Sequence, residues 1–313
     1  TPSETAVPAT RDFKMDEKVG QHYVPKFYLR QFGTSEGNKP ICRVFCFDKL
    51  LGKSYLVNVN KIGKENYFNN VDGTQAFEDA LAKYEGFISS SYHQLLKVER
   101  LSELSLKDKT LIAHMIATQH SRTRDVRELI KEASSHVALQ LKNENLEVPS
   151  FIEKLTYEEN AKRFQYDLMA KTTSKFAMLL MQMKWYLFHN QTSVSFWTSD
   201  KPLIYFNIFP HDKFDGLGYT RPGSELYFPL NPKMTLAIVD PRLYDGLSED
   251  LDIEDIAEVL SFNERQVRNS RRYLFSLDPD FSLAEKIIAM EPDLRDIEKN
   301  RFQNEKIDWS KFL

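Results

Sequence analysis

Helical periodicity through the middle of the sequence is the feature that most constrains how this chain can fold. Between residues 75 and 183, apolar side chains recur every three or four positions, which gives each helix one buried face. After residue 190 the apolar runs become short and are separated by Pro, Gly and Asp, as in strands joined by turns. This order predicts one helix-rich α+β domain over residues 21–280, in which helices and strands share a core.

The individual elements follow from this periodicity and from the turn residues. The N-terminal part is predicted to hold a short helix at 24–32 and a β-hairpin with strands at 42–49 and 54–59. The central bundle is predicted to hold long helices at 75–98, 105–141 and 156–183. A small antiparallel sheet follows, with strands at 193–198, 203–206, 225–228, 235–239 and 272–276 and a helix at 253–269. Residues 1–20 are predicted to be a disordered leader, and residues 281–313 an amphipathic helical tail.

Composition argues against several classes of protein. The chain has 42 Lys plus Arg against 45 Asp plus Glu, so it lacks the overall positive charge of a general nucleic-acid binder. No apolar run approaches the roughly 18 residues of a membrane span, and the first 20 residues hold no signal-peptide segment. Cys42 and Cys46 are too far apart on a strand for an unstrained disulfide and lack metal-site spacing. We therefore expect a soluble, cytoplasmic protein with two buried thiols.

Known cofactor loops are also missing from the sequence. There is no Walker A loop, no GxGxxG motif, no kinase motif set and no EF-hand loop. ATP-driven chemistry and dinucleotide redox chemistry are therefore disfavoured.

Polar and aromatic residues gather just before the first predicted helix. His22 could act as a general acid or base, because the pKa of histidine lies near physiological pH. Arg30 could hold a phosphate or carboxylate in a bidentate fork, and Tyr23 would line the same site. The alternative is that His22 caps the helix and Arg30 pairs with an acid.

Two central helices carry further candidates. Gln119 and Arg122 lie three residues apart on one helix face, where burial would be costly unless they bind a ligand or each other. Glu78 and Glu85 lie two turns apart on the preceding helix. These two carboxylates could bind a divalent cation or act as an acid–base pair, or they could form the solvated edge of an amphipathic helix.

A polar turn at the end of a strand is the last candidate. The strand is expected to run into Ser199 and Asp200 and to stop at Pro202, and a strand end holds such side chains in fixed positions. Asp200 could be a base or a metal ligand, or it could form an Asx turn that closes the strand. Ser199 lacks the GxSxG elbow of a nucleophilic serine.

The order of these motifs resembles an uncharacterised bacterial family, also found in fungi, whose members begin with a His-Tyr-Val-Pro-x-Phe-Tyr-Leu-x-x-Phe signature. Here the signature spans residues 22–32. The similarity continues to about residue 277 through these features: Tyr67-Phe68, the helix with Glu85, Gln119 with Arg122, Thr198-Ser199-Asp200, Phe228-Pro229-Leu230 with Pro232, and Asn263.

That family has no known function, so the resemblance implies no activity. It does imply that the polar positions form one pattern that converges in space, comprising His22, Arg30, Gln119, Arg122, Ser199 and Asp200. One departure is visible, because this chain has Lys201 where family members often carry Asn before the proline. Any role that a neutral amide would play at this position is therefore in doubt.

Two functional hypotheses remain open from the sequence. The first is a phosphodiester hydrolase, a nuclease of the defence or toxin kind. His22 would be the acid or base, Arg30 and Arg122 would stabilise phosphoryl charge, and Asp200 would orient His22 or hold Mg²⁺. The remaining substrate contacts, to nucleic acid, would come from Tyr23, Gln119 and Ser199. The second hypothesis is a non-catalytic binding module, in which the same residues recognise an anionic ligand or hold the helices against the strands.

Overall fold

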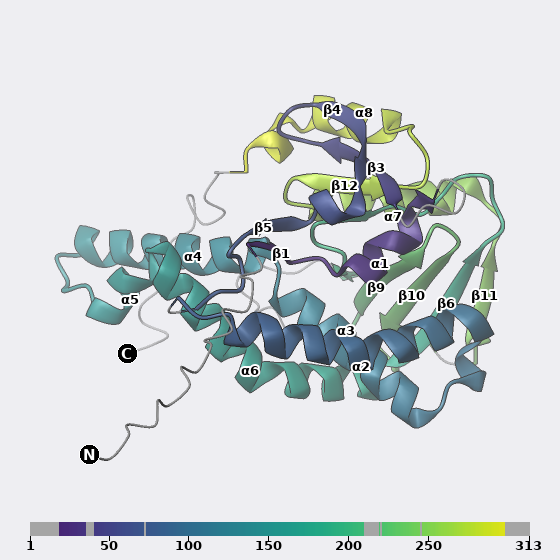
Figure 1. Ribbon diagram of the computed structural model, residues 1–313, viewed down its shortest axis with the longest axis horizontal. Helices are drawn as coiled ribbons and strands as arrows, with labels where there is room; N and C mark the ends of the chain where they lie inside the picture. Colours follow the sequence, from purple (N-terminus) through teal and green to yellow (C-terminus); the bar gives the residue numbers. More distant parts are fainter. Residues whose placement is uncertain are drawn as a thin grey trace, which may run out of the picture.

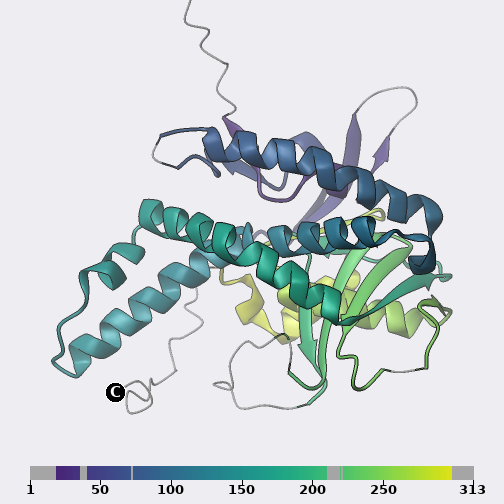
Figure 2. The same ribbon diagram turned by 90° about the horizontal axis from the view of Figure 1, so that it is seen from below.

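Long helices on one side and two five-stranded sheets on the other make up the described part of the chain (Figures 1 and 2). A computed structural model describes residues 19–35, 41–71, 73–209, 219, 221–244 and 246–297. Within these residues the predicted α+β class and the central helical bundle are confirmed. All but the end of the predicted leader, and the last part of the predicted tail, lie outside the described residues.

The described helical layer contains five helices where the sequence pattern predicts three. Its helices are α2 (Ala76–Val98), α3 (Leu106–Ser121), α4 (Arg124–Asn143), α5 (Ser150–Leu155) and α6 (Glu158–Gln182). The predicted helix at 105–141 is therefore wrong as one element, because it consists of α3 and α4. The chain turns at Thr123, whose backbone is extended, while the apolar spacing continues across the turn and hides it.

The first five-stranded sheet packs against the long helices through a shared hydrophobic core. Its strands are β6 (Lys184–Asn190), β8 (Ile204–Asn207), β9 (Ser224–Asn231), β10 (Met234–Val239) and β11 (Asp250–Ile253). They lie in the order β11-β6-β10-β9-β8, and all neighbours are antiparallel except β11 and β6, so the sheet is mixed. The sequence pattern missed β6, because its largely apolar run follows α6 directly and has no alternation to mark it.

The second sheet joins the two ends of the domain. Its strands are β2 (Thr34–Ser35), β3 (Cys42–Asp48), β12 (Tyr273–Ser276) and β7 (Thr198–Ser199), with β4 (Lys53–Asn58) paired to β3. Of the predicted strand at 193–198, only Thr198 lies in a strand, as the first residue of β7. Both cysteines are buried and unpaired. The remaining C-terminal elements are α7 (Ile256–Asn269), α8 (Ser282–Met290) and η4 (Pro292–Arg295).

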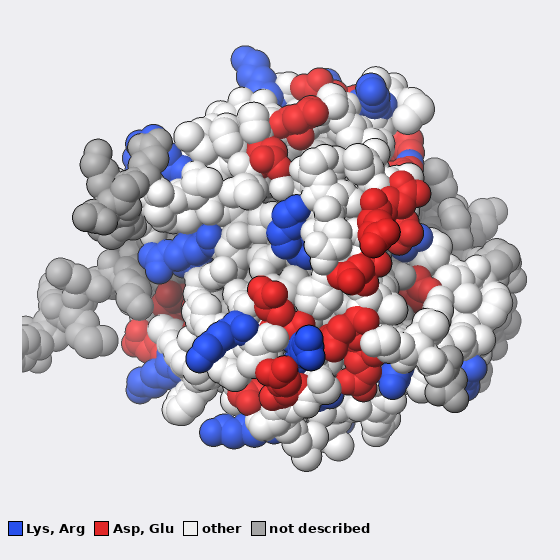
Figure 3. Space-filling view, turned by 90° about the vertical axis from the view of Figure 1, so that its right-hand side faces the viewer, with Lys and Arg blue, Asp and Glu red and all other residues white. Residues whose placement is uncertain are grey.

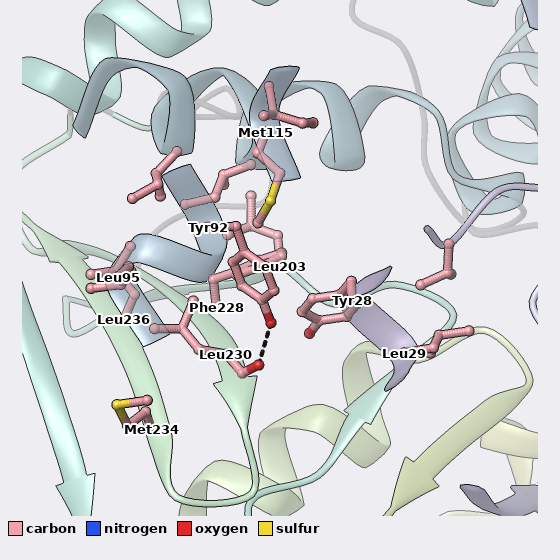
Figure 4. Close-up of a cluster of buried hydrophobic side chains, with 14 of the residues drawn as sticks. Tyr28, Leu29, Tyr92, Leu95, Met115, Leu203, Phe228, Leu230, Met234 and Leu236 are labelled. Atoms are coloured by element: carbon pink, nitrogen blue, oxygen red, sulfur yellow. Dashed lines mark hydrogen bonds between the residues drawn. The ribbon is translucent and has the colours of Figure 1, made fainter. Parts of the chain in front are cut away.

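Two buried tyrosines tie the N-terminal signature and the bundle to the first sheet (Figure 4). Tyr28 belongs to the short helix α1 (Lys26–Leu29), and its hydroxyl donates to the Pro229 carbonyl oxygen at 2.7 Å. The Tyr92 hydroxyl, from α2, donates to the Leu230 carbonyl oxygen. The signature and the bundle are therefore both bonded to the Phe-Pro-Leu segment of β9.

The outer ends of α4 and α6, together with α5, project from the body as an arm (Figures 1 and 2). Phe164 and Leu168 lie on α6 and are 43% and 40% exposed. Their helical spacing suggested a core-facing stripe, but they lie on the solvent side of the arm. None of the described helices is both long and apolar enough to cross a membrane.

Candidate functional site

The signature begins with a strand rather than with the helix start that its sequence suggested. Strand β1 (Gly20–His22) pairs antiparallel with β5 (Lys64–Asn66). The fully buried Gln21 side chain accepts a hydrogen bond from the Asn69 N–H at 2.6 Å and donates to Asn70. The backbone of the signature is thereby fixed before α1 begins, and its polar side chains have defined directions.

Gln119 and Arg122 reach the signature from α3, on the shared face that their spacing predicts. Gln119 Nε2 donates to the Tyr23 carbonyl oxygen at 3.0 Å, and Arg122 donates to the His22 carbonyl oxygen and forms an ion pair with Glu85. Both side chains are 2% exposed. Both side chains therefore supply hydrogen bonds to buried backbone carbonyl oxygens. Without a donor, these oxygens would lower the stability of the fold.

His22 is buried and turned towards the 3₁₀ turn η2 (Val59–Lys61). Its Nε2 lies 3.3 Å from the Val59 carbonyl oxygen, so the neutral ring donates to that oxygen. Burial, reinforced by the positive charges of Lys26, Lys64 and Arg122, lowers the pKa of His22 to about 4. The imidazole is therefore neutral near pH 7 and has little tendency to take up a proton there.

This burial makes stability depend on the protonation of His22. The unfolded chain takes up a proton near pH 6.5 and the folded chain only near pH 4, so stability is full above pH 6.5 and falls as the pH drops towards 4. The loss attributable to His22 is expected to reach up to about 3 kcal/mol. Urea unfolding between pH 7.5 and 4.5 should show a weaker pH dependence in His22→Gln than in the wild type.

The control for this measurement is His93→Gln, because His93 is exposed on α2. It should leave the pH dependence unchanged. Burial also lowers the pKa of His120 to about 4, so a residual dependence should remain in His22→Gln. Equal pH dependence in the wild type and His22→Gln would contradict the buried state of His22.

The Asp200 carboxylate holds the segment that leads into β12 of the second sheet. It accepts hydrogen bonds from the backbone N–H groups of Arg271, Arg272 and Tyr273 at 2.9, 2.8 and 3.1 Å. Burial raises the pKa of this carboxyl, although the three amide donors and the nearby Lys49 oppose that effect. The structure therefore resembles the Asx-turn alternative in kind, but the partners are Arg271 and Arg272, just before β12, and Tyr273, its first residue, rather than residues of the turn itself.

Ser199 and Lys49 are also held by internal bonds. The Ser199 hydroxyl accepts a hydrogen bond from Gln266 on α7 and another from the Lys201 N–H at 3.0 Å. Lys49 is 1% exposed, and its Nζ donates to the carbonyl oxygens of Val267 and Ser270 at the end of α7. Burial lowers the pKa of Lys49 to about 8.

The structure does not bring all the candidates together. Arg30 is exposed at the first residue of the 3₁₀ helix η1 (Arg30–Phe32), directly after α1, and its charge acts on Cys42. Glu78 accepts a hydrogen bond from Asn69 at 2.6 Å, while Glu85 pairs with Arg122, so the two helix carboxylates have separate partners. Within the described residues, no group of three His, Cys, Asp or Glu side chains could hold a metal ion.

Tyr23 connects the signature to the Asp200 turn. Its side chain is 4% exposed, and burial, together with the negative charges of Asp200 and Glu65, raises the pKa of its phenol. Its hydroxyl makes no hydrogen bond with the described residues. The Tyr23 hydroxyl is therefore a polar atom of the candidate set without a partner among the described residues, as are the buried Gln119 Oε1 and Arg122 Nε atoms.

A set of charged residues near the Asp200 turn was not proposed as a site from the sequence. Lys201 Nζ lies 2.9 Å from Asp125 at the start of α4, and Arg271 Nη1 lies 3.8 Å from Asp125 and 3.7 Å from Glu132. Their partners are far apart in the chain, so no local pattern announces them. The one signal was Lys201 itself, which replaces the amide common in the resembling family.

The fold and this network define a class of protein: an α+β domain in which polar side chains from a helical bundle hold the backbone of an N-terminal signature. The chain belongs to the family described as Protein of unknown function (DUF4238), whose model matches residues 20–280. The match starts at β1 and ends after β12, so it contains every candidate residue above. No curated protein and no solved structure matches the chain.

Proposed function

We propose that this protein binds a small anionic ligand without turning it over, beside the Asp200 turn. The observation that supports the proposal most is a cation cluster, defined here as Lys49, Lys201 and Arg271. Burial lowers the pKa of Lys49, the charges of Asp200 and Asp125 oppose this effect, and those of Lys201 and Arg271 add to it, so the three cations share one electrostatic environment. A bound anion would relieve their mutual repulsion.

Lys201 and Arg271 are the two cations of the cluster that a ligand could reach from solvent. The side chains of Lys201 and Arg271 are 26% and 14% exposed, whereas Lys49 is held beneath them by backbone carbonyls. Both Arg271 ion pairs are long for charged groups, at 3.7 and 3.8 Å. A phosphate or carboxylate could therefore form shorter, charge-assisted hydrogen bonds with Arg271 than Asp125 and Glu132 do, while Arg271 Nη2 stays bonded to the Ile297 carbonyl oxygen.

The network around His22 favours binding over hydrolysis. His22 is neutral and bonded to a carbonyl, Arg122 is committed to Glu85 and the backbone, and Asp200 accepts three amides. A phosphodiester hydrolase would need at least one of these groups to be free for the substrate.

One face of the molecule is unsuited by its charge to a nucleic-acid backbone. On the face shown in Figure 3, acidic side chains form groups and basic side chains are scattered between them. A phosphate backbone is usually bound along a continuous basic stripe.

Inorganic phosphate is the probe for this proposal, at constant ionic strength set with chloride. The melting temperature should rise with phosphate concentration, reaching a stabilisation of roughly 3 kcal/mol at a hundred times Kd. Lys201→Ala should weaken phosphate binding about tenfold or more, because it removes a charge-assisted contact. Lys175→Ala, at an exposed position on α6, is the matched control and should bind as the wild type does.

The same protein should be incubated with RNA and DNA oligonucleotides, with and without Mg²⁺. No cleavage is expected. Cleavage by the wild type that His22→Ala abolishes would establish the hydrolase instead. A melting temperature that does not respond to phosphate would reject the anion-binding proposal.

A further inference from the structure

Strand β8 forms one edge of the first sheet and borders a groove. In the order β11-β6-β10-β9-β8 it has β9 on one side and no strand on the other within the described residues. The groove between β8 and α7 has a volume of about 470 Å³. Its lining is divided between the strand, with Ile204, Tyr205 and Phe206, and the helix, with Ser261, Glu264, Arg265, Arg268 and Asn269.

The backbone of β8 offers hydrogen-bonding groups to this groove. The Ile208 N–H bonds to the Gly223 carbonyl oxygen, so by the alternation of an antiparallel ladder Phe206 and Ile204 also turn their backbone groups towards β9. Tyr205 lies between them and turns its N–H and carbonyl oxygen outward. Neither group has a partner among the described residues, so this stretch of edge can accept another strand.

Helix α7 shows where the open stretch begins. Leu203 shares the outward parity of Tyr205, and its carbonyl oxygen already accepts a hydrogen bond from Asn269 Nδ2 at 3.0 Å. Asn269 also bonds to the Lys201 carbonyl oxygen at 2.7 Å. The helix thus covers the edge up to Leu203 and leaves it uncovered at Tyr205, the residue that lines the groove.

The groove carries a positive charge without an acidic partner. The Arg265 guanidinium lies 4.2 Å from the centre of the Phe206 ring and 5.5 Å from that of Tyr227. Arg265 forms no ion pair with any described residue, whereas its neighbour Arg268 is paired with Glu264 and Glu291. An arginine held on aromatic rings is well placed to receive a carboxylate.

We propose that the β8–α7 groove binds an extended peptide segment of a partner protein, which adds a strand beside β8 and places an acidic side chain on Arg265. Strand addition uses main-chain hydrogen bonds for affinity and side-chain pockets at alternate positions for specificity. Here the main-chain partner is Tyr205. The specificity contact is the Arg265 guanidinium, and the partly buried Phe206 provides apolar contact beside it. The inference is independent of the anion site beside Asp200.

A random heptapeptide library displayed on phage and selected against the whole chain tests this proposal. The selected peptides should share an acidic residue flanked by β-branched or aromatic residues. The strongest of them, made synthetically with a fluorescent label, should bind Arg265→Ala at least tenfold more weakly than the wild type. Arg100→Ala removes an exposed arginine elsewhere and should leave binding unchanged.

Two further measurements separate strand addition from a simple charge contact. N-methylation of the peptide, one backbone amide at a time, should weaken binding at the position that donates to Tyr205 and not at its two neighbours, because alternate N–H groups face β8. A peptide whose acid is replaced by lysine should regain affinity for Arg265→Glu. Both results would support an extended peptide paired to the edge.

The proposal has clear contrary outcomes. It fails if no peptide is enriched, if enriched peptides bind Arg265→Ala as well as the wild type, or if N-methylation shows no alternation. It also fails if light scattering gives twice the chain mass and Arg265→Ala makes the protein monomeric, because the groove would then be occupied by a second copy of this chain.

Discussion

Asp200→Ala is expected to lower the free energy of unfolding by at least about 3 kcal/mol. The variant removes the acceptor of three backbone N–H groups on Arg271, Arg272 and Tyr273, and each such group costs about 1–3 kcal/mol when buried without a partner. It also removes the carboxylate whose negative charge contributes most to stabilising the buried Lys49 ammonium. Urea denaturation followed by circular dichroism measures the effect.

Asp167→Ala is the matched control, since Asp167 is exposed on α6 and its removal should change stability little. Asp200→Asn keeps the shape of the side chain but replaces one acceptor oxygen with a donor, so it should fall between the wild type and Asp200→Ala. A stable Asp200→Ala protein would show that the carboxylate is not needed for the fold. A catalytic or ligand-binding role would then be the better explanation of this residue.

Arg127→Ala is expected to be the most damaging single arginine substitution, at about 3–5 kcal/mol. Arg127 is 1% exposed and lies 4.0 Å above the Phe68 ring. Its guanidinium donates to Gln165, Glu158, the Phe68 carbonyl oxygen and the Tyr166 hydroxyl. Truncation would leave the buried acceptors on Gln165 and Phe68 without this donor and open a cavity beside the aromatic ring.

Arg124→Ala provides the comparison three residues earlier on α4. Arg124 forms more ion pairs, with Glu65, Glu128 and Glu158 at 3.2, 2.6 and 2.9 Å, but its side chain is 29% exposed. Its loss should cost less than about 1 kcal/mol, because exposed ion pairs contribute little. Urea unfolding of both variants decides the point. Equal destabilisation would mean that burial of the guanidinium does not control its contribution.

The sequence predicted those parts of the fold whose signals are local. Turn residues and alternation located the hairpin of β3 and β4, and apolar spacing located α2 and α6. The break between α3 and α4 was missed because the spacing runs through it. Strand β6 was missed because both of its faces are buried, and such a run looks the same as the end of a helix.

The candidate site divides in the same way. Helical geometry alone placed Gln119 and Arg122 on one face, and the structure confirms that placement. Their partners, the carbonyl oxygens of His22 and Tyr23, could not be inferred, because they lie about a hundred residues away in the chain. The signature made Arg30 look like a member of the same site, although its side chain, in η1 directly after α1, is exposed.

The pairing of β3 with β12 sets a rule for the order of events during synthesis. Tyr273 pairs with Asp48, and Phe275 with Cys46, so the second sheet needs strands from both ends of the domain. The hairpin must therefore wait, with one edge uncovered, until nearly the whole domain has left the ribosome. Closing such a long loop is slow, so newly made chains will depend most on protection from aggregation in the interval before β12 arrives.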